Sequence, residues 1–414
     1  MSREMKDSGI EWEKSVPLTW NKCRLKDYYT FEKGKNASVY TKNYNGLHKG
    51  IYPVYSGQTE NNGIMGQIDT YDYDIQECLF TTTVGAKVMA PKILKGKFSL
   101  SQNCLIMRNY THYKCFNQFI YYLLFPLFDY EKSKIPSYMQ PSLRIEDLKT
   151  YTFYIPTFTE QQKIASFLDE KTKEIDNTIE KTKETIELYK KYKQAIITEA
   201  VTKGLDSNVE MKDSGIEWVG KIPVNWSIRK GKYILNLLNR CIEENSGVVT
   251  CFRDGQVTLR ENRRTEGFTN AVKEIGYQGV KPGDLVVHGM DGFAGAIGIS
   301  DSIGKMSPII NVLDSNQNKK YLMYYLRSMA FENVFLATAT GIRERSCDLR
   351  WNKLANLEYL IPPLSEQQKI ADFLDKKCIY IDSLIENKND LLKKTENYKK
   401  SLIYEYVTGK KEVK

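Results

Sequence analysis

Two stretches of the chain are rich in side chains that can hydrogen bond to DNA. Arginine, lysine, asparagine and glutamine can read base edges, and lysine, arginine and hydroxyl side chains can contact phosphates. In the first stretch the candidates are Gln58, Thr59, Asn61, Asn62, Lys87, Gln102, Asn103, Tyr138 and Gln140. In the second stretch they are Arg253, Gln256, Arg260, Arg263, Arg264, His288, Lys305, Arg343 and Arg345. Any single one could be an ordinary solvated loop residue, so the prediction of DNA contact depends on the whole collection.

The sequence lacks the patterns that usually carry catalysis or bind a cofactor. It contains no Gly-x-x-x-x-Gly-Lys-Ser/Thr loop, no Asn/Asp-Pro-Pro-Tyr/Phe motif of an amino-methyltransferase, and no recognisable nuclease triad of two acids and a lysine. The nearest approach to a metal site is Cys104, His112 and Cys115, which lacks a fourth ligand and a standard spacing. No helix N-terminus is expected after the glycine-rich segment 289–298, which we interpret as a tight loop that lets backbone approach a ligand such as DNA. We therefore predict a non-catalytic chain with no metal and no cofactor of its own.

Length and composition indicate a multidomain protein with a polyanionic partner. A chain of 414 residues is long enough for two or three domains, and 41% hydrophobic residues are enough to build cores. The formal net charge of +9 suits nucleic acid. The longest apolar run, 119–128, is half the length of a membrane span, and the N-terminus has no apolar segment of a signal peptide. We expect a cytoplasmic protein.

An internal repeat organises the chain. The octapeptide Met-Lys-Asp-Ser-Gly-Ile-Glu-Trp begins at Met5 and recurs without change at Met211, an offset of 211 − 5 = 206 residues. The hexapeptide Glu-Gln-Gln-Lys-Ile-Ala recurs at the same offset, at 160–165 and 366–371. One offset shared by distant segments indicates a tandem duplication.

The segments between the repeated motifs diverge. Residues 21–142 and 227–348 show little resemblance to each other, although the flanking sequence is shared. Each reads as a mixed α/β globule that ends in an aromatic-rich helix, near 116–128 and 320–330. We interpret the chain as one frame used twice, with two inserts that do related work on different targets.

Each frame copy contains a long helix. Thr159 and Ser365 are the predicted N-caps. A narrow apolar stripe on an otherwise charged helix is typical of a coiled coil, so the two copies are predicted to pair antiparallel about an approximate two-fold axis. The predicted seam residues are Ile175, Ile179, Ile186, Ile196, Ile381, Ile385, Leu392 and Leu402. Lys193 and Lys399 interrupt the seam in both copies.

These features resemble the specificity subunit of a type I restriction–modification enzyme. The resemblance covers the whole chain and is carried by the repeated Met-Lys-Asp-Ser-Gly-Ile-Glu-Trp leader, the Pro-x-x-Trp that follows it, and the helix starts at 155–169 and 361–375. It implies an α+β fold with two mixed α/β target recognition domains, joined by two long helices in an antiparallel coiled coil and related by a pseudo-two-fold tandem repeat. The implied boundaries are 1–156 for the first recognition domain with its leader, 157–204 for the first spacer helix, 205–362 for the second recognition domain, and 363–414 for the second helix and tail.

The resemblance also implies a function and a set of partners. The chain is expected to read a bipartite asymmetric site in double-stranded DNA and to dock two methylation subunits. S-adenosylmethionine is expected on those partners, and ATP and Mg²⁺ on an ATP-dependent restriction and translocation subunit. Two alternatives stay open at this point: a free-standing coiled-coil DNA-binding regulator or scaffold, and a nuclease or methyltransferase with unrecognised motifs.

Overall fold

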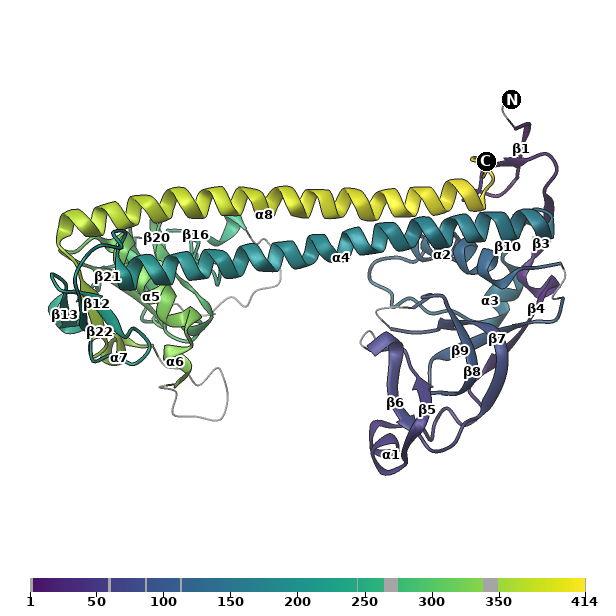
Figure 1. Cartoon of the computed structure of the whole chain (residues 1–414), viewed down its shortest axis with the longest axis horizontal. Helices are drawn as coiled ribbons and strands as arrows, with labels where there is room; N and C mark the ends of the chain where they lie inside the picture. The colour runs from purple at the N-terminus through teal and green to yellow at the C-terminus, as the bar shows by residue number, and fades with distance from the viewer. Residues whose placement is uncertain are drawn as a thin grey trace. The chain divides into compact units, whose positions relative to one another are not determined.

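The chain divides into two compact units. The structure, a computed structural model, describes residues 3–58, 61–85, 88–111, 114–243, 245–263, 275–337 and 349–413 (Figure 1). Unit 1 comprises Met1–Lys183 and Asp390–Lys414, and unit 2 comprises Glu184–Asn389. Each unit therefore contains one insert, one leader and a part of each long helix.

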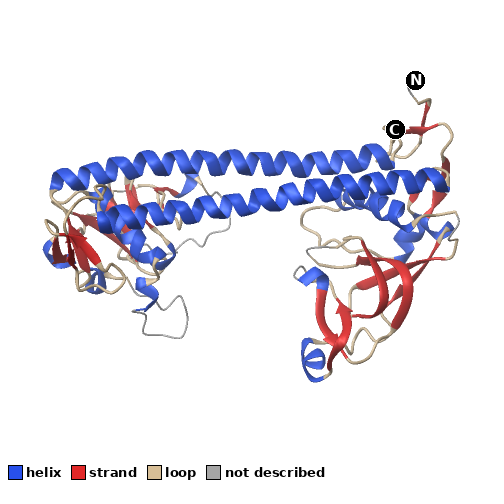
Figure 2. Cartoon of the chain, in the orientation of Figure 1, coloured by secondary structure: helices blue, strands red, loops and turns tan. Residues whose placement is uncertain are grey.

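Two long helices run through the frame. Helix α4 spans Phe158–Lys203 and helix α8 spans Leu364–Val407, and both are visible as uninterrupted helices in Figures 1 and 2. The absence of glycine and proline inside these segments permits such length. The predicted α+β class and the duplicated long helix are confirmed.

The start of each long helix differs from the prediction. Helix α4 begins before Thr159, and the Thr157 hydroxyl accepts a hydrogen bond from the Glu160 amide at 3.4 Å. In α8 the corresponding position is Pro363, whose carbonyl accepts from the amides of residues 366 and 367. Thr159 and Ser365 are thus inside their helices, and the predicted caps were two residues too late. Proline cannot donate a backbone hydrogen bond but still offers its carbonyl, so it can begin a helix without a capping side chain.

Short frame elements recur around both inserts. In unit 1 they are β1 (Met5–Asp7), β2 (Ser15–Pro17), β3 (Asn21–Arg24), α3 (Ile145–Thr150) and β10 (Thr152–Ile155). In unit 2 they are β11 (Met211–Asp213), β12 (Lys221–Pro223), β13 (Ser227–Lys230), α7 (Trp351–Leu354) and β22 (Glu358–Ile361). The antiparallel pairs β1–β2 and β3–β10 have the same registers as β11–β12 and β13–β22, shifted by 206 residues. The two copies of the frame thus fold alike.

The first insert is built on one sheet. The described residues form six strands in the order β4–β9–β7–β8–β5–β6, in which β5 and β8 are parallel and the other neighbours are antiparallel. Their bounds are β4 (Tyr29–Lys33), β5 (Lys49–Tyr55), β6 (Ile64–Ile68), β7 (Tyr73–Thr82), β8 (Lys92–Leu100) and β9 (Cys104–Asn109). Helix α2 (Asn117–Ser133) packs on one face and α1 (Lys42–Leu47) lies beside β6. Successive residues of β7 therefore enter different cores: Leu79 packs with α2, and Phe80 packs in a second cluster.

The second insert has a different sheet. Its four-stranded sheet has the order β14–β21–β18–β19, and two hairpin-like pairs, β15–β16 and β17–β20, lie beside it. The bounds are β14 (Asn236–Leu237), β15 (Val249–Cys251), β16 (Val257–Leu259), β17 (Gln278–Val280), β18 (Leu285–His288), β19 (Ile297–Ile299), β20 (Gly304–Met306) and β21 (Ile310–Asp314). Helix α5 (Lys319–Phe331) covers one face and is followed by α6 (Val334–Ala337). Short 3-10 turns lie at Leu25–Asp27, Asn61–Gly63, Gly231–Tyr233, Arg260–Asn262 and Gly292–Ala294.

Within each unit the two long helices are in contact. In unit 1 the Lys399 ammonium lies 2.6 Å from the Asp176 carboxylate, and in unit 2 Lys193 lies 2.6 Å from Asp382. Each pair is the other shifted by 206 residues with the two helices exchanged, as an antiparallel pseudo-two-fold repeat requires. The lysines that interrupt the predicted seam therefore form interhelical ion pairs.

The seam residues differ in burial. Ile186, Ile381 and Leu402 are buried, and Ile175, Ile179, Ile196, Ile385 and Leu392 are half-buried. Two neighbouring residues absent from the predicted seam, Ile197 and Ile403, are also buried. Both are adjacent in sequence to a predicted seam residue, which is the error expected when a helical period is extrapolated over ten turns.

Candidate nucleic-acid interface

The candidates of the first insert lie on connections at one edge of its sheet. Gln58, Asn61 and Asn62 form the connection between β5 and β6, which is closed by a hydrogen bond from the Ser56 amide to the Gly63 carbonyl at 2.8 Å. Asn61 and Asn62 have positive φ angles of 46° and 52°, a conformation that asparagine tolerates better than most residues. The Gln58 amide donates to the Ile64 carbonyl at 2.6 Å. The fold thus gives this turn a defined shape.

Backbone hydrogen bonds join three other connections to this turn. The Ser101 amide donates to the Tyr55 carbonyl at 2.8 Å, the Thr83 amide to Asn103 at 2.9 Å, and the Leu143 amide to Thr83 at 2.8 Å. Gln102 and Asn103 are exposed within this chain of contacts, as are Tyr138 and Gln140, which precede Leu143. Tyr138 has 86% of its side chain exposed, so it contributes little to the core. The structure therefore brings four separate segments of candidates to one edge, while Thr59 and Lys87 lie outside the described residues.

In the second insert, arginines surround the turn between β15 and β16. The Arg253 guanidinium contacts the Asp291 carboxylate at 2.8 Å, and Arg263 contacts Asp254 at 2.7 Å. Arg263 also lies over the Phe252 ring, 4.3 Å from its centroid. Partial neutralisation and stacking hold the two guanidinium groups in place at the surface, where planar donors can meet a base edge or a phosphate. Sequence reasoning selected the arginines but passed over the two aspartates that orient them.

The remaining candidates of the second insert are distributed around the same hairpin. Gln256 is exposed in the turn, and its amide donates to the Asp254 carboxylate at 3.0 Å. Arg260 and Lys305 lie at the other end, where their amides donate to the carbonyls of residues 248 and 247 at 2.8 and 2.9 Å. Arg264, Arg343 and Arg345 lie outside the described residues. The candidates that the structure describes therefore form two groups, at the two ends of the β15–β16 hairpin.

His288 is held as a neutral acceptor. Its Nδ1 accepts hydrogen bonds from the amides of Met290 at 3.2 Å and Asp291 at 3.0 Å, which requires an unprotonated Nδ1. Burial lowers its pKa, and the opposing effect of Asp291 is smaller. His288 therefore fixes the loop that carries Asp291, and through Asp291 it affects the orientation of Arg253.

The glycine-rich segment has a different role from the one predicted. A side chain at Gly289 would meet the carbonyl of residue 309 at 2.5 Å, and one at Gly298 would meet the Gly255 carbonyl at 2.0 Å. Gly295 has a φ of 92° and faces the Arg253 carbonyl at 2.7 Å. These glycines allow the chain's own backbones to approach each other, and the prediction of a close approach by an external ligand was wrong. The segment supports the β15–β16 turn from below.

The thiols suggested by sequence as metal ligands lie apart. Cys104 packs in the cluster on one face of the first sheet and Cys115 in the cluster on the other face, while His112 lies outside the described residues. Burial raises the pKa of both thiols to about 12, so neither provides a thiolate near neutral pH. Among the described residues, no group of three or more His, Cys, Asp or Glu is arranged to hold a metal ion.

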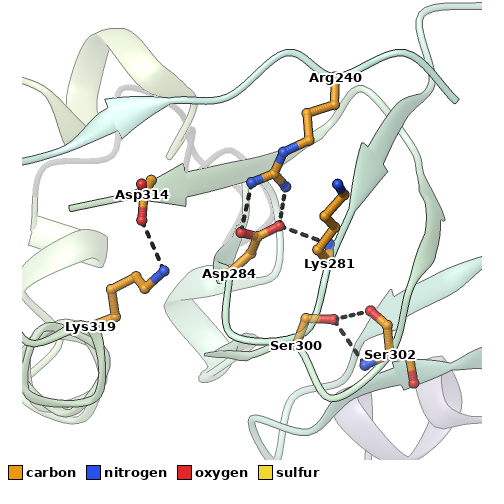
Figure 3. A network of polar contacts seen from close by, with 7 residues as sticks. All are labelled: Arg240, Lys281, Asp284, Ser300, Ser302, Asp314 and Lys319. Carbon is orange, nitrogen blue, oxygen red and sulfur yellow. Dashed lines mark hydrogen bonds and ion pairs between the residues drawn. The ribbon is translucent and has the colours of Figure 1, made fainter.

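A polar network fixes the strands behind the second candidate group. Figure 3 shows the Arg240 guanidinium forked onto the buried Asp284 carboxylate, which also accepts from the Lys281 amide at 2.8 Å. Asp314 and Lys319 form an ion pair at 2.9 Å in the same region. Arg240 is thus used inside the protein, because a buried carboxylate needs a cationic partner.

The fold and the candidate site together define a DNA-recognition protein with two different reading surfaces on a duplicated frame. Comparison with known proteins gives the family. The chain belongs to the type I restriction modification DNA specificity domain family, whose model matches residues 17–188 and 269–394. It is the DNA-recognition component of such a system and is not catalytic.

Individual relatives agree with this assignment. The type I restriction enzyme MjaVIII specificity subunit of Methanocaldococcus jannaschii is 23% identical over 96% of this chain and 94% of its own length. A putative type I specificity subunit of Mycoplasma pneumoniae is 33% identical over 35% of this chain and 38% of its own length. A chain from a solved structure on complex assembly and conformational transition of the type I R-M system has a TM-score of 0.65 at 12% identity, covering 95% of this chain and 98% of that one. That last likeness shows the fold. No helix among the described residues is long and apolar enough to cross a membrane.

Proposed function

We propose that this chain reads a bipartite, asymmetric site in double-stranded DNA, with one half-site assigned to each insert. The observation that carries the proposal is the presence of two differently built groups of candidate readers on two copies of one frame. An amide-rich edge in the first insert and an arginine-rich hairpin in the second offer different hydrogen-bonding patterns, so they should prefer different bases. An unread gap would separate the two half-sites.

The residues that we propose to contact DNA are the candidates selected from the sequence. In the first insert, the neighbouring turns of Gln58, Asn62, Gln102 and Asn103 can present amides to base edges. In the second, Arg253 and Arg263 are held by carboxylates that leave part of each fork exposed. Candidates outside the described residues, such as Arg264, remain predictions from the sequence.

We further propose that the frame docks two methylation subunits. Tyr192 on α4 and Tyr398 on α8 occupy equivalent positions, and both are more than half exposed although they are large and partly apolar. Exposed aromatic residues repeated on a symmetric frame fit a partner that binds twice. The catalytic requirements would then be met by the partners: S-adenosylmethionine on the methylation subunits, with ATP and Mg²⁺ on an ATP-dependent restriction and translocation subunit. Such a complex would act on DNA in the cytoplasm.

The proposed domain boundaries follow from this division of labour. Residues 1–156 and 205–362 would be the two recognition domains with their leaders, and 157–204 and 363–414 the two spacer helices, the second with its tail. Copurification with a protein that binds S-adenosylmethionine would separate this function from that of a free-standing regulator, which needs no such partner.

An exchange of inserts tests the two-reader proposal. Residues 227–348 are replaced by the corresponding insert of a relative, and the modified sites are mapped in cells that also express the methylation subunits. We expect one half-site to change while the other half-site and the gap persist, and the exchange of 21–142 should change the opposite half. A change in both halves after a single exchange would refute independent readers.

A further inference from the structure

Each unit contains a cavity at the junction of frame and insert, and the two cavities correspond. The cavity of unit 1 has a volume of about 620 Å³ and that of unit 2 about 330 Å³. The frame contributes Asp169, Thr172 and Asp176 to the first and Asp375, Cys378 and Asp382 to the second, at the repeat offset of 206. Two inserts with little sequence resemblance are therefore seated on the same frame positions.

A second wall of each cavity comes from the last helix of the insert. Gln118 and Tyr122 of α2 line the first cavity, and Lys320 and Tyr324 of α5 line the second. Their offset is 324 − 122 = 202 residues, four fewer than that of the frame. A change of offset inside an otherwise divergent segment conceals this correspondence from a comparison of the two halves at one fixed spacing.

The contacts made by these residues are the same in both units. The Tyr122 hydroxyl donates to the Asp169 carboxylate at 2.7 Å, and the Tyr324 hydroxyl donates to Asp375 at 2.8 Å. Burial raises the pKa of both tyrosines, so each hydroxyl remains a donor. Each aspartate also accepts from the residue one turn earlier on the insert helix, Gln118 in unit 1 and Lys320 in unit 2.

A buried glutamine makes a further repeated contact two turns earlier on the frame helix. Gln161 accepts a hydrogen bond from the Phe116 amide at 2.7 Å and donates to the Pro156 carbonyl at 3.0 Å. Gln367 accepts from the Asn318 amide at 3.0 Å and donates to Pro362 at 2.8 Å. The frame thus holds the start of the insert helix at two points.

The third wall consists of candidate DNA-reading residues. Asn62 lines the cavity of unit 1, and Gln256 lines that of unit 2. The first belongs to the β5–β6 connection of a six-stranded sheet and the second to the β15–β16 turn, so different strands bring a reading turn to the same place on the frame.

We propose that Asp169 and Asp375 are positioning residues: each fixes the orientation of one insert helix on the frame, and through it the placement of the reading turn of that insert. The inference deepens the proposed function and depends on it. Apolar packing of α2 and α5 on the long helices is non-directional, whereas hydrogen bonds to a carboxylate are directional. Packing holds each insert on the frame, and the aspartate selects its angle and register.

The test uses the full chain with its methylation subunits and compares Asp375→Ala with Asp375→Asn. Asparagine keeps a carbonyl oxygen that can accept from Tyr324, whereas alanine does not. Duplexes are selected from a library with randomised sequence, and base preference is measured in each half-site. Asp375→Ala should lower the preference in the half read by the second insert roughly tenfold, the factor expected for one charge-assisted hydrogen bond. Asp375→Asn should restore it.

The chain supplies its own controls. Asp169→Ala should affect only the opposite half-site, and Asp390→Ala, an exposed aspartate of α8, should affect neither. The proposal is refuted if Asp375→Ala weakens both halves equally or neither, or if asparagine behaves as alanine does.

Hydrogen exchange separates this inference from the proposed function, because it needs no DNA. Asp375→Ala should accelerate exchange at the start of α5 and in residues 252–256, and leave residues 55–58 and 61–63 of unit 1 unchanged. If the wild-type complex selects no preferred sequence, the proposed function fails, and the positioning role is then judged by exchange alone. Unchanged exchange in unit 2 would overturn it.

Discussion

Replacing Glu13 by glutamine should remove a pH-dependent loss of stability from unit 1. Glu13 is fully buried, and its Oε1 accepts a long hydrogen bond of 3.4 Å from the Tyr154 amide. Its Oε2 has no hydrogen-bond partner among the described residues. The equivalent position of the second frame copy is Val219, which is also buried (219 − 13 = 206). The first copy thus holds a carboxyl group where the second holds a methyl-bearing side chain.

The magnitude follows from the pKa of this carboxyl group. Burial raises the pKa of Glu13 from 4.5 to about 8, although the Tyr154 amide, Lys410 and Lys22 each act in the opposite direction. Below pH 4.5 the group is protonated in both the folded and the unfolded chain and has no effect. Between pH 4.5 and 8 only the unfolded chain releases its proton, so the free energy of unfolding falls as pH rises. A difference of 8 − 4.5 = 3.5 units corresponds to a loss on the order of 5 kcal/mol by pH 8.

Urea unfolding of the full chain at pH 5, 6.5 and 8.5 measures the effect, with hydrogen exchange of residues 5–24 to localise it. Glu13→Gln and wild type should differ least at pH 5, and the variant should be the more stable by several kcal/mol at pH 8.5. Glu13→Val, which copies the second frame, should follow the glutamine variant in its pH dependence. Glu217→Gln, an exposed glutamate of the second leader, is the matched control. If wild type and Glu13→Gln lose stability in parallel as pH rises, Glu13 is ionised in the folded chain and the reasoning is wrong.

Two further predictions concern the frame helices. A double-mutant cycle on Lys193 and Asp382 should give a coupling free energy of about 0.5–1 kcal/mol that decreases with added salt, because the aspartate is largely exposed; zero coupling at low salt would show that the ion pair does not contribute. Residues 1–206, expressed alone, expose a seam whose natural partner is missing, and they should form a homodimer that recognises a palindrome of one half-site. A monomeric mass in solution, with no binding of a methylation subunit, would contradict the pairing of the two frame copies.

The sequence by itself determined the duplicated frame, the long helices and the family. These follow from local information: an octapeptide repeated without change, a helical period of apolar residues, and helix starts that occur twice. The candidate readers could also be selected by residue type, since amides and guanidinium groups suit base edges whatever fold presents them. Their selection did not require knowledge of where the segments meet.

Only the tertiary structure decided which of these features act together. Lys193 interrupts an apolar seam in the sequence, and its partner Asp382 lies almost two hundred residues away. Gly298 fits a ligand-binding loop by composition, yet it makes room for the Gly255 carbonyl. The equivalence of Tyr122 and Tyr324 appears only when both are seen on the same frame aspartate. In each case the outcome depends on contacts between residues far apart in the chain, and local propensity and periodicity carry no information about such contacts.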